Sequence, residues 1–202
     1  MTIDSARPRR GRLDQEVVLV AAETLIDRDG YDALTMTSLA AELDARVSSL
    51  YNHVASLEEL RSLVQVRAMK MLGEHVRTAA MGHAGADGLR ALSHQLRIFA
   101  QQHPQRYAAL TRPPLDRDAF YTAALDAIEA LAVMVRSAGL PEERLIPTAI
   151  AIFASLHGFV SLEVAGYFGD LSGVNEAVDL NEVFELVIRG AVTATVLEAT
   201  AR

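Results

Sequence analysis

Five short or planar polar side chains lie close together between residues 47 and 54, and their chemistry suits contacts with DNA. They are Ser48, Ser49, Tyr51, Asn52 and His53. Hydroxyl, amide and imidazole groups of this size reach phosphates and base edges when the helix that carries them lies in the major groove. The sequence therefore predicts a recognition helix in which Tyr51 and His53 contact phosphates, while the two serines and Asn52 read base edges.

The recognition helix needs an anchor on its inner face. Val47, Leu50 and Val54 follow one another at i, i+3 and i+7, the spacing that holds one face of a helix on a core. This pattern predicts about two helical turns from Val47 to Val54. Arg46 and Val47, at the start of the helix, are also expected to lie at the DNA surface.

A second short helix is expected just upstream of the first. Its apolar face is formed by Leu39, Ala40 and Leu43. Thr35 or Thr37 is the predicted N-cap because a threonine hydroxyl accepts hydrogen bonds from unpaired amides at a helix start. Both threonines are candidate DNA contacts. Asp44 falls at the turn between the two helices, and aspartate tolerates left-handed backbone. The segment is therefore a predicted helix-turn-helix.

The first dozen residues are rich in arginine. Arg7, Arg9, Arg10 and Arg12 are opposed there by Asp4 alone. This charge is enough to follow the phosphate backbone or enter the minor groove, so Arg9, Arg10 and Arg12 are candidate DNA contacts. A solvated basic tail is the alternative. The formal net charge of −7 does not exclude DNA binding, because arginine is concentrated in this arm while acidic residues prevail downstream.

Composition bounds the chemistry available to the chain. Its 202 residues, half of them hydrophobic, can bury a substantial core, and they include no cysteine. Disulfides, thiolate zinc sites and thiol redox chemistry are therefore excluded. Neither a signal peptide nor an uninterrupted apolar span is evident, so a soluble cytoplasmic protein with no membrane partner is expected.

Catalytic patterns find no support in the sequence. His83 and Asp87 have the spacing of metal ligands, but they lie in a glycine-rich break without an obvious third ligand, so a solvated loop is expected. No nucleophile elbow or phosphate-binding glycine loop is present. We therefore expect a protein that is not an enzyme and has no catalytic residue, metal site or cofactor.

Helical periodicity recurs between evident breakers, which predicts an all-α fold of about nine helices. The expected helices span Leu13 to Arg28, the two short segments described above, Leu57 to Ala80, Leu89 to Gln102, Pro104 to Leu110, Asp116 to Ala138, Glu142 to Phe168 and Asp179 to Thr200. Gly82 to Gly88 is the clearest predicted loop, and Pro147 is expected to kink or restart its helix. Residues 1–57 are expected to form the DNA-binding domain and residues 58–202 a second helical domain, joined through the helix from 57 to 80.

The run LTMTSLAAELDARVSSLYNHVASLEEL, from Leu34 to Leu60, resembles the DNA-binding domain of TetR-type transcriptional regulators. The resemblance extends from about Arg10 to Val64. It includes the spacing of Gly30, Tyr31 and Thr35 and the Leu50-Tyr51-x-His53 signature. Three positions depart from the family pattern: Asp44 replaces a turn glycine, Arg46 a small N-cap residue, and Leu57 a lysine that commonly contacts phosphate. Loss of that lysine removes one phosphate contact.

A second resemblance concerns the C-terminal half. The segment around His157 and Gly158, and the run HPQRYAAL from His103 to Leu110, resemble the WHG-type C-terminal domain of one branch of the family, with Ser155 or Leu156 at the tryptophan position. In the family the last two long helices pair with their copies in a four-helix bundle. The small or β-branched residues expected at this homodimer interface are Ala154, Gly158, Ser161, Ala165, Val183, Val187, Gly190 and Ala194.

The family resemblance also implies a pocket for a small-molecule effector. The candidate lining residues are Phe99, Tyr107, Phe120, Tyr121, Met134, Phe153 and His157. Aromatic residues and methionine at helical spacing are also typical of plain core. For His157 the alternative is a buried, hydrogen-bonded neutral imidazole that fixes helix packing or the dimer seam.

Together these features predict a dimeric repressor that binds an inverted-repeat operator in double-stranded DNA and is released by an unknown small molecule. The helix from 57 to 80 would act as the lever between the two domains. A ligand-binding or sequestering protein with a weak DNA-reading head is the alternative, favoured by Leu57 and the acidic balance. A helical enzyme is a second alternative without a positive argument.

Overall fold

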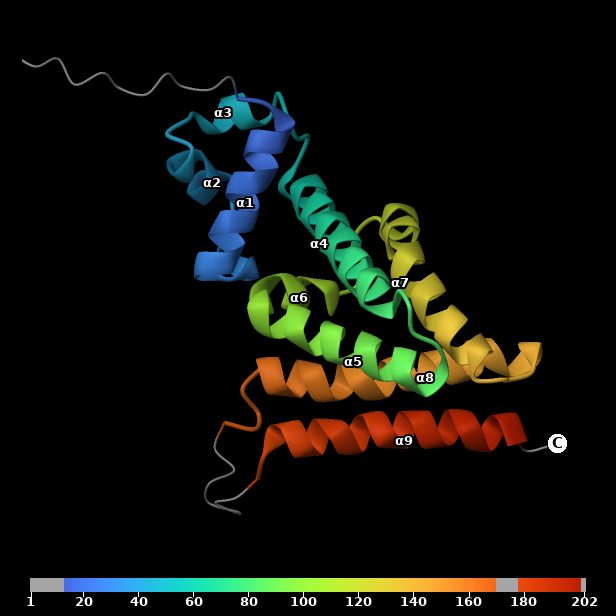
Figure 1. The fold of residues 1–202 in the computed structure, drawn as a ribbon. Coiled ribbons are helices and arrows are strands. Elements are labelled where there is room, and N and C mark those ends of the chain that lie inside the picture. The colour runs from blue at the N-terminus through green and yellow to red at the C-terminus, as the bar shows by residue number, and fades with distance from the viewer. Residues whose placement is uncertain (1–12, 170–177, 201–202) are drawn as a thin grey trace, which may run out of the picture.

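The computed structural model describes residues 13–169 and 178–200, with side chains placed as far as residue 195, and every regular element in these ranges is helical (Figure 1). The elements are α1 (Gln15–Asp29), the 3₁₀ turn η1 (Tyr31–Ala33), α2 (Met36–Glu42), α3 (Val47–Leu50), α4 (Leu57–Ala80), α5 (Gly85–Gln102), α6 (Pro104–Leu110), α7 (Arg117–Ser137), α8 (Glu142–Val164) and α9 (Leu180–Thr200). The nine α-helices confirm the predicted fold class.

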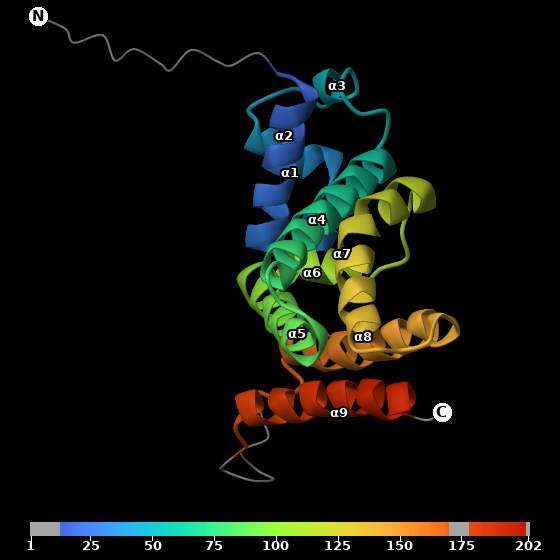
Figure 2. The same cartoon turned by 45° about the vertical axis from the view of Figure 1, so that its right-hand side comes forward.

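Two hydrophobic cores lie one after the other along α4. The first is formed by α1, α2 and α3 with Leu60 and Val64 of α4, and we call this unit the head. The second includes Leu72 and Val76 of α4 and is formed with α5 to α9; we call this unit the body. Figure 2 shows α4 running from the head into the body beside α7. One continuous helix is therefore part of both cores.

Capping residues explain where the head helices begin and end. The Asp14 side chain accepts a hydrogen bond from the Val17 amide at 2.9 Å and starts α1. Gly30 ends α1 with a positive φ of 93°, and its amide donates to the Ile26 carbonyl. Ser56 accepts from the Glu59 amide at 3.0 Å, which starts α4 at the predicted residue, Leu57.

In the body, two predicted helix limits are wrong by four residues each. The predicted loop from Gly82 to Gly88 contains the first turn of α5, which begins at Gly85. A Cβ at Gly88 would lie 1.9 Å from the sulfur of Met134, so this glycine permits close packing of α5 on α7 rather than a turn. At the other end of the body, α8 stops at Val164 instead of Phe168, where Gly166 adopts a positive φ of 78°. Pro147 lies inside α8, which continues through it.

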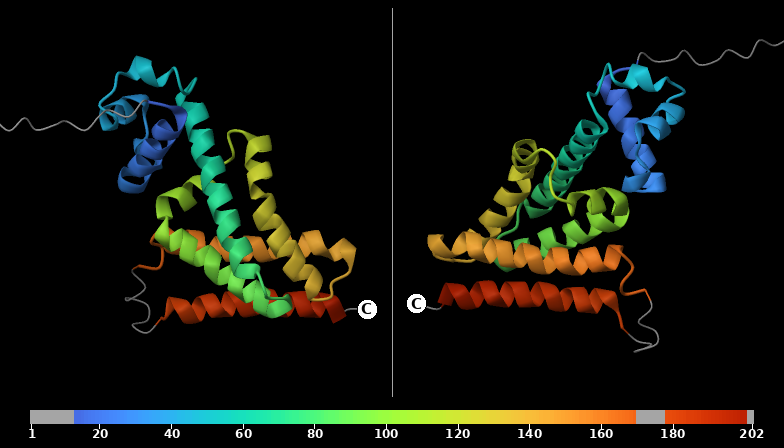
Figure 3. Two further views of the ribbon diagram at one scale, coloured as in Figure 1. Left: turned by 45° about the horizontal axis from the view of Figure 1, so that its top comes forward. Right: turned by 180° about the vertical axis from the view of Figure 1, so that it is seen from behind.

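α8 and α9 run antiparallel, side by side, at the end of the molecule remote from the head (Figure 3). Arg97 of α5 fixes both of them. Its guanidinium binds both oxygens of Glu163 on α8, with Nε to Oε2 at 2.8 Å, and donates to Asn181 of α9 at 3.0 Å. The same group lies over the rings of Phe159 and Phe184. This cluster joins the end of α8 and the start of α9 to α5.

The outer surface of α8 is apolar. By length and composition α8 could cross a membrane, with a mean hydropathy of 1.8 over its most apolar 18-residue stretch. Its inner side is packed on the body, where Ile152, Leu156 and Val160 are at most 3% exposed. Ile150 on the outer side is 63% exposed. The helix therefore has one face in the protein core and a second apolar face that the described residues leave uncovered.

We expect Glu163→Leu to lower the free energy of unfolding by about 3 kcal/mol or more, because it leaves the Arg97 charge buried without its partner. The double variant Arg97→Met/Glu163→Leu should recover most of this loss, since no uncompensated charge remains. Urea unfolding measures both. The matched control is Arg77→Ala, which removes an exposed pair with Asp126 and should cost less than about 1 kcal/mol. A double variant no more stable than Glu163→Leu would contradict this explanation.

Candidate DNA-binding and effector sites

The polar residues predicted to read DNA lie on the outside of the head. Ser48, Tyr51 and Asn52 are exposed, and Ser49 and His53 are half-buried. Behind them, Leu50 and Val54 are 0% and 2% exposed in the head core. The buried residues thus hold the polar ones at the surface, as the spacing predicted.

The recognition element is shorter than predicted. α3 is a single turn, Val47–Leu50, followed by a turn through Tyr51, Asn52 and His53. The Asn52 and His53 amides donate to carbonyls three residues back, at Ser49 and Leu50, so the chain tightens after one helical turn. Val47, a predicted DNA contact, is half-buried against the head core, and its side chain is mainly an anchor.

α2 and the turn after it have the predicted local chemistry. Thr35, rather than Thr37, is the N-cap: its hydroxyl accepts from the Ser38 amide at 3.0 Å, and the Ser38 hydroxyl accepts from the Thr35 amide at 2.9 Å. Both threonines are exposed. Asp44 adopts a φ of 46°, the left-handed conformation that a glycine would otherwise supply.

The head has little free positive charge within the described residues. Arg28 is paired with Asp29 and Glu42, and Arg61 donates to the Leu34 carbonyl at 3.0 Å while lying over the Tyr31 ring. Arg46 is exposed at the N-cap of α3, beside the residues predicted to read DNA. Leu57 packs on the head core and offers no charge at the surface. The predicted contacts Arg9, Arg10 and Arg12 lie outside the described residues.

A polar cluster in the body joins α6 to α8. The Tyr107 hydroxyl lies 2.7 Å from Nδ1 of His157, and the Phe153 ring stacks on the imidazole at a centroid distance of 5.3 Å. Burial lowers the pKa of His157 and raises the pKa of Tyr107, so a neutral imidazole faces a protonated phenol. The phenol therefore donates to Nδ1, which leaves the ring proton on Nε2, 3.4 Å from the Ser161 hydroxyl.

The seven predicted pocket residues do not converge on one site. Tyr107, Phe153 and His157 form the cluster just described. Phe99 and Met134 are fully enclosed in the body core. Phe120 is buried beside Tyr121, a residue of α7 that is 51% exposed. The structure therefore brings three of the seven together.

Sequence reasoning missed an ion-paired seam between the head and α6. Arg106 binds Asp27 of α1 through Nε at 3.0 Å and Nη2 at 2.6 Å. Arg112 binds Asp32 at 2.8 Å and lies over the Tyr31 ring. The HPQRYAAL run drew attention to this segment, but the pattern did not reveal which surface its arginine meets. Adjacent residues of α6 thus contact different parts of the molecule: Arg106 binds α1 of the head and Tyr107 binds α8.

The eight predicted interface residues lie on α8, its C-cap residue and α9, and two of them, Val183 and Val187, pack against the body core. Five are exposed, namely Ala154, Gly158, Ala165, Gly190 and Ala194, and three are half-buried, namely Ser161, Val183 and Val187. Apart from the chain neighbours and the backbone of the same helix, no heavy atom of the described residues lies within 4 Å of a Cβ built on Gly158 or Gly190. Both glycines therefore leave open space on the surface of the protomer.

Similarity to known proteins identifies the family of this chain. Residues 89–191 match the model of the tetracyclin repressor-like C-terminal domain. Over 187 residues the chain is 37% identical to an uncharacterised HTH-type transcriptional regulator of Mycobacterium tuberculosis, with 91% of this chain and 82% of the relative covered. The chain belongs to the TetR family. It is thus a member of a family of helix-turn-helix transcriptional regulators, in agreement with the exposed polar residues on and after α3.

A further relative and two solved structures are also similar to this chain. An HTH-type transcriptional repressor of Streptomyces coeruleorubidus, DrrR1, is 28% identical over 150 residues, covering 72% of this chain and 53% of the relative. The structure of ActR from Streptomyces coelicolor in complex with actinorhodin matches with a TM-score of 0.68 at 22% identity, covering 94% of this chain and all of that one. A TetR variant of Acinetobacter baumannii in complex with minocycline matches at 0.70 and 18% identity, covering 94% and 97%. The two structural likenesses establish the fold.

We expect His157→Gln to flatten the pH dependence of stability. Because burial lowers the pKa of His157 from its ordinary 6.5, its contribution is complete above that pH and declines as the pH falls and the unfolded chain takes up a proton. Between about pH 7.5 and 5.5, the urea midpoint of the variant should fall less than that of the native chain. The urea midpoint of the variant should still depend on pH to some extent, because burial also lowers the pKa of His103.

The control for this measurement is His83→Gln, since His83 is exposed. Its midpoint should follow the native curve. Parallel curves for the native chain and His157→Gln would show that the His157 imidazole is not held neutral by the fold.

Proposed function

We propose that this TetR-family protein is a dimeric, cytoplasmic repressor that binds an inverted-repeat operator and leaves it when a small molecule binds the body. The single observation that carries the proposal is the outer surface of the head: Ser48, Tyr51 and Asn52 are exposed over the buried anchors Leu50 and Val54. A surface of hydroxyl and amide groups on a short recognition element suits DNA.

Dimer formation is supported by the outer face of α8 and α9. The exposed small residues Ala154, Gly158 and Gly190 permit close approach of helices, and the exposed Ile150 and Leu186 supply apolar surface to bury. A twofold dimer places two heads about one DNA turn apart, which requires an operator with inverted symmetry.

The effector site that we propose is the cluster of Tyr107, Phe153 and His157. Phe153 is 48% exposed and stacked on His157, so a planar apolar ligand could extend the stack, while Ser161 and His157 offer polar groups. A ligand that separates Tyr107 from His157 would shift α6, whose Arg106 holds the head. ActR bound to actinorhodin and the TetR variant bound to minocycline support the proposal by their family membership.

The test is selection of bound fragments from random DNA, followed by anisotropy titration of the enriched sequence across salt concentrations. An inverted repeat, bound with a large specific-to-nonspecific ratio, is the expected outcome. Absence of enrichment, with weak and salt-sensitive binding alone, would favour the sequestering alternative with a head that no longer reads DNA.

We expect Asn52→Ala to change which bases are preferred, because Asn52 is assigned to base edges. Tyr51→Phe should instead weaken all sequences alike, because a phosphate contact carries no sequence information. Repeating the selection with each variant separates the two effects. Unchanged preference for Asn52→Ala would remove this residue from base reading, and a loss confined to particular base pairs would contradict the phosphate role of Tyr51.

We expect Gly158→Leu to produce a monomer. The open space around Gly158 accepts the new side chain within the protomer, but the side chain would hold two α8 helices apart at the interface. Sedimentation velocity reports the mass, and circular dichroism reports that the helices are intact. Thr122→Leu, an exposed position on α7, is the matched control and should stay dimeric. A dimeric Gly158→Leu protein would place the interface elsewhere.

A further inference from the structure

The charge of the head is opposite to that expected for a surface that approaches phosphates. Residues 13–64 contain ten aspartates and glutamates against three arginines and no lysine. Residues 1–12, which join directly to α1, contain four arginines against one aspartate. A basic arm is thus attached to an acidic head, and opposite charges this close attract one another unless DNA competes.

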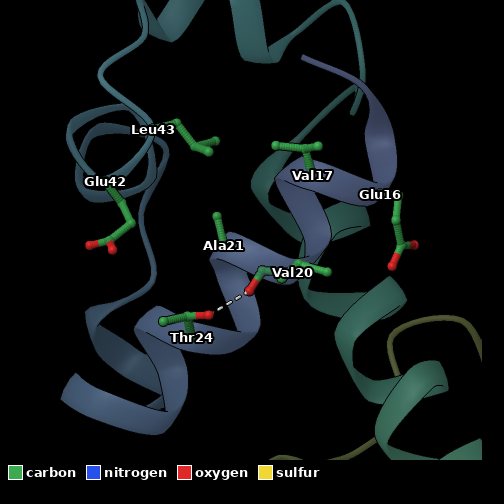
Figure 4. A pocket seen from close by; sticks show the side chains of 7 residues that line it. All are labelled: Glu16, Val17, Val20, Ala21, Thr24, Glu42 and Leu43. Atoms are coloured by element: carbon green, nitrogen blue, oxygen red, sulfur yellow. Dashed lines mark hydrogen bonds between the residues drawn. The ribbon is translucent and has the colours of Figure 1, made fainter. Parts of the chain in front are cut away.

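The acidic head carries an open groove beside α1. It is an open depression of about 410 Å³ between α1 and the end of α2 (Figure 4). Val17, Val20 and Leu43 lie between the carboxylates of Glu16 and Glu42, which stand on opposite sides. Val17 and Val20 are 39% and 44% exposed, which leaves apolar surface on α1 that the head core does not cover.

Both carboxylates can accept a further arginine. Arg67 contacts Oε1 of Glu16 at 2.6 Å, and Arg28 contacts Oε2 of Glu42 at 3.0 Å. Among the described residues nothing donates to the second oxygen of either group. A carboxylate accepts several hydrogen bonds, and exposed ion pairs of this kind are weak enough to be shared.

We propose that, in the absence of DNA, residues 1–12 fold back along α1 and occupy this groove. Their arginines bind Glu16 and Glu42, and Ile3 covers the exposed valines. The stretch of α1 that borders the groove, from Glu16 to Thr24, is about 12 Å long, whereas nine extended residues reach about 30 Å. Gly11, just before the head, permits the reversal of direction.

In this arrangement the arm can bind either the groove or the phosphate backbone of DNA, but not both at once. Nonspecific DNA then has to displace the arm, so weak encounters are disfavoured relative to an operator on which α3 also makes base contacts. That consequence rests on the proposed function, but the docking itself is a property of the free protein and can be measured without DNA.

Paramagnetic relaxation enhancement tests the docking directly, because the cysteine-free chain accepts a single nitroxide label at Ser5→Cys. We expect strong broadening of the methyl signals of Val17, Val20 and Leu43, and none at Leu186, an exposed residue of α9. Mixing labelled and unlabelled chains should leave the unlabelled signals sharp. Broadening spread over the surface, or transferred to the unlabelled chain, would overturn docking by the chain's own arm.

A double-mutant cycle measures the effect on DNA binding. In the full chain, Glu16→Gln/Glu42→Gln should tighten nonspecific DNA binding by about twofold to fivefold for each arm contact removed, beyond the effect of the charge change alone. With Arg9→Ala and Arg10→Ala added, the extra gain should disappear. Glu58→Gln, at an exposed head residue away from the groove, measures the effect of removing one negative charge and is the control for each single Glu→Gln change. Additive effects would show that the arm and the groove do not interact.

The two proposals fail separately. If the methyl signals of the groove are broadened but no operator is bound, the docked arm stands and the proposed repressor function is wrong. If an operator is bound but the methyl signals of the groove are not selectively broadened, the proposed function stands and the docking is wrong.

Discussion

The orientation of the DNA-reading head depends on the ion-paired seam between α1 and α6. Arg106 is 17% exposed, and it binds Asp27 through two nitrogens while lying 3.9 Å from the buried Glu23. Burial raises the pKa of Glu23 even though Arg106 and Arg67 oppose the effect, so this carboxylate depends on its arginines to remain ionised. A partly buried, bidentate arginine–carboxylate pair fixes the relative orientation of the two side chains as well as the distance between them. The seam therefore holds α1, and with it the head, at a set angle to the body.

α6 also connects the proposed ligand site to the head. Tyr107 bonds His157 of α8, and the neighbouring Arg106 bonds the head, so a displacement of α6 changes both contacts together. α4 constrains this motion because it contributes to both cores. A ligand can shift the head no further than its difference in affinity for the two arrangements allows.

Local chemistry could be predicted from the sequence, and long-range pairing could not. The Thr35 cap, the Asp44 turn and the buried spacing of Leu50 and Val54 follow from patterns that span a few residues. α4 and α6 have the predicted limits because Ser56 and Pro104 define their starts. The recognition helix was predicted too long because apolar spacing continues to Val54, whereas the backbone hydrogen bonds tighten after Leu50.

The errors elsewhere arise from tertiary contacts. Gly88 resembles a turn glycine in the sequence, and Met134, 46 positions later, gives it its actual role in close packing. Arg106 and Asp27 are 79 residues apart, and no periodicity indicates that they meet. The aromatic residues predicted for one pocket had suitable helical spacing, but spacing alone does not distinguish the enclosed Phe99 from the exposed Tyr121.

The most direct measurement is the distance between head and body, by electron spin resonance on a chain labelled at Ser48→Cys and Thr122→Cys and diluted with unlabelled chain. Both positions are exposed, and no native cysteine interferes. If the seam sets the head, the native distance distribution should be narrow, and Arg106→Gln should broaden or shift it, while Arg77→Gln should leave it unchanged. An Arg106→Gln distribution identical to the native one would contradict the account.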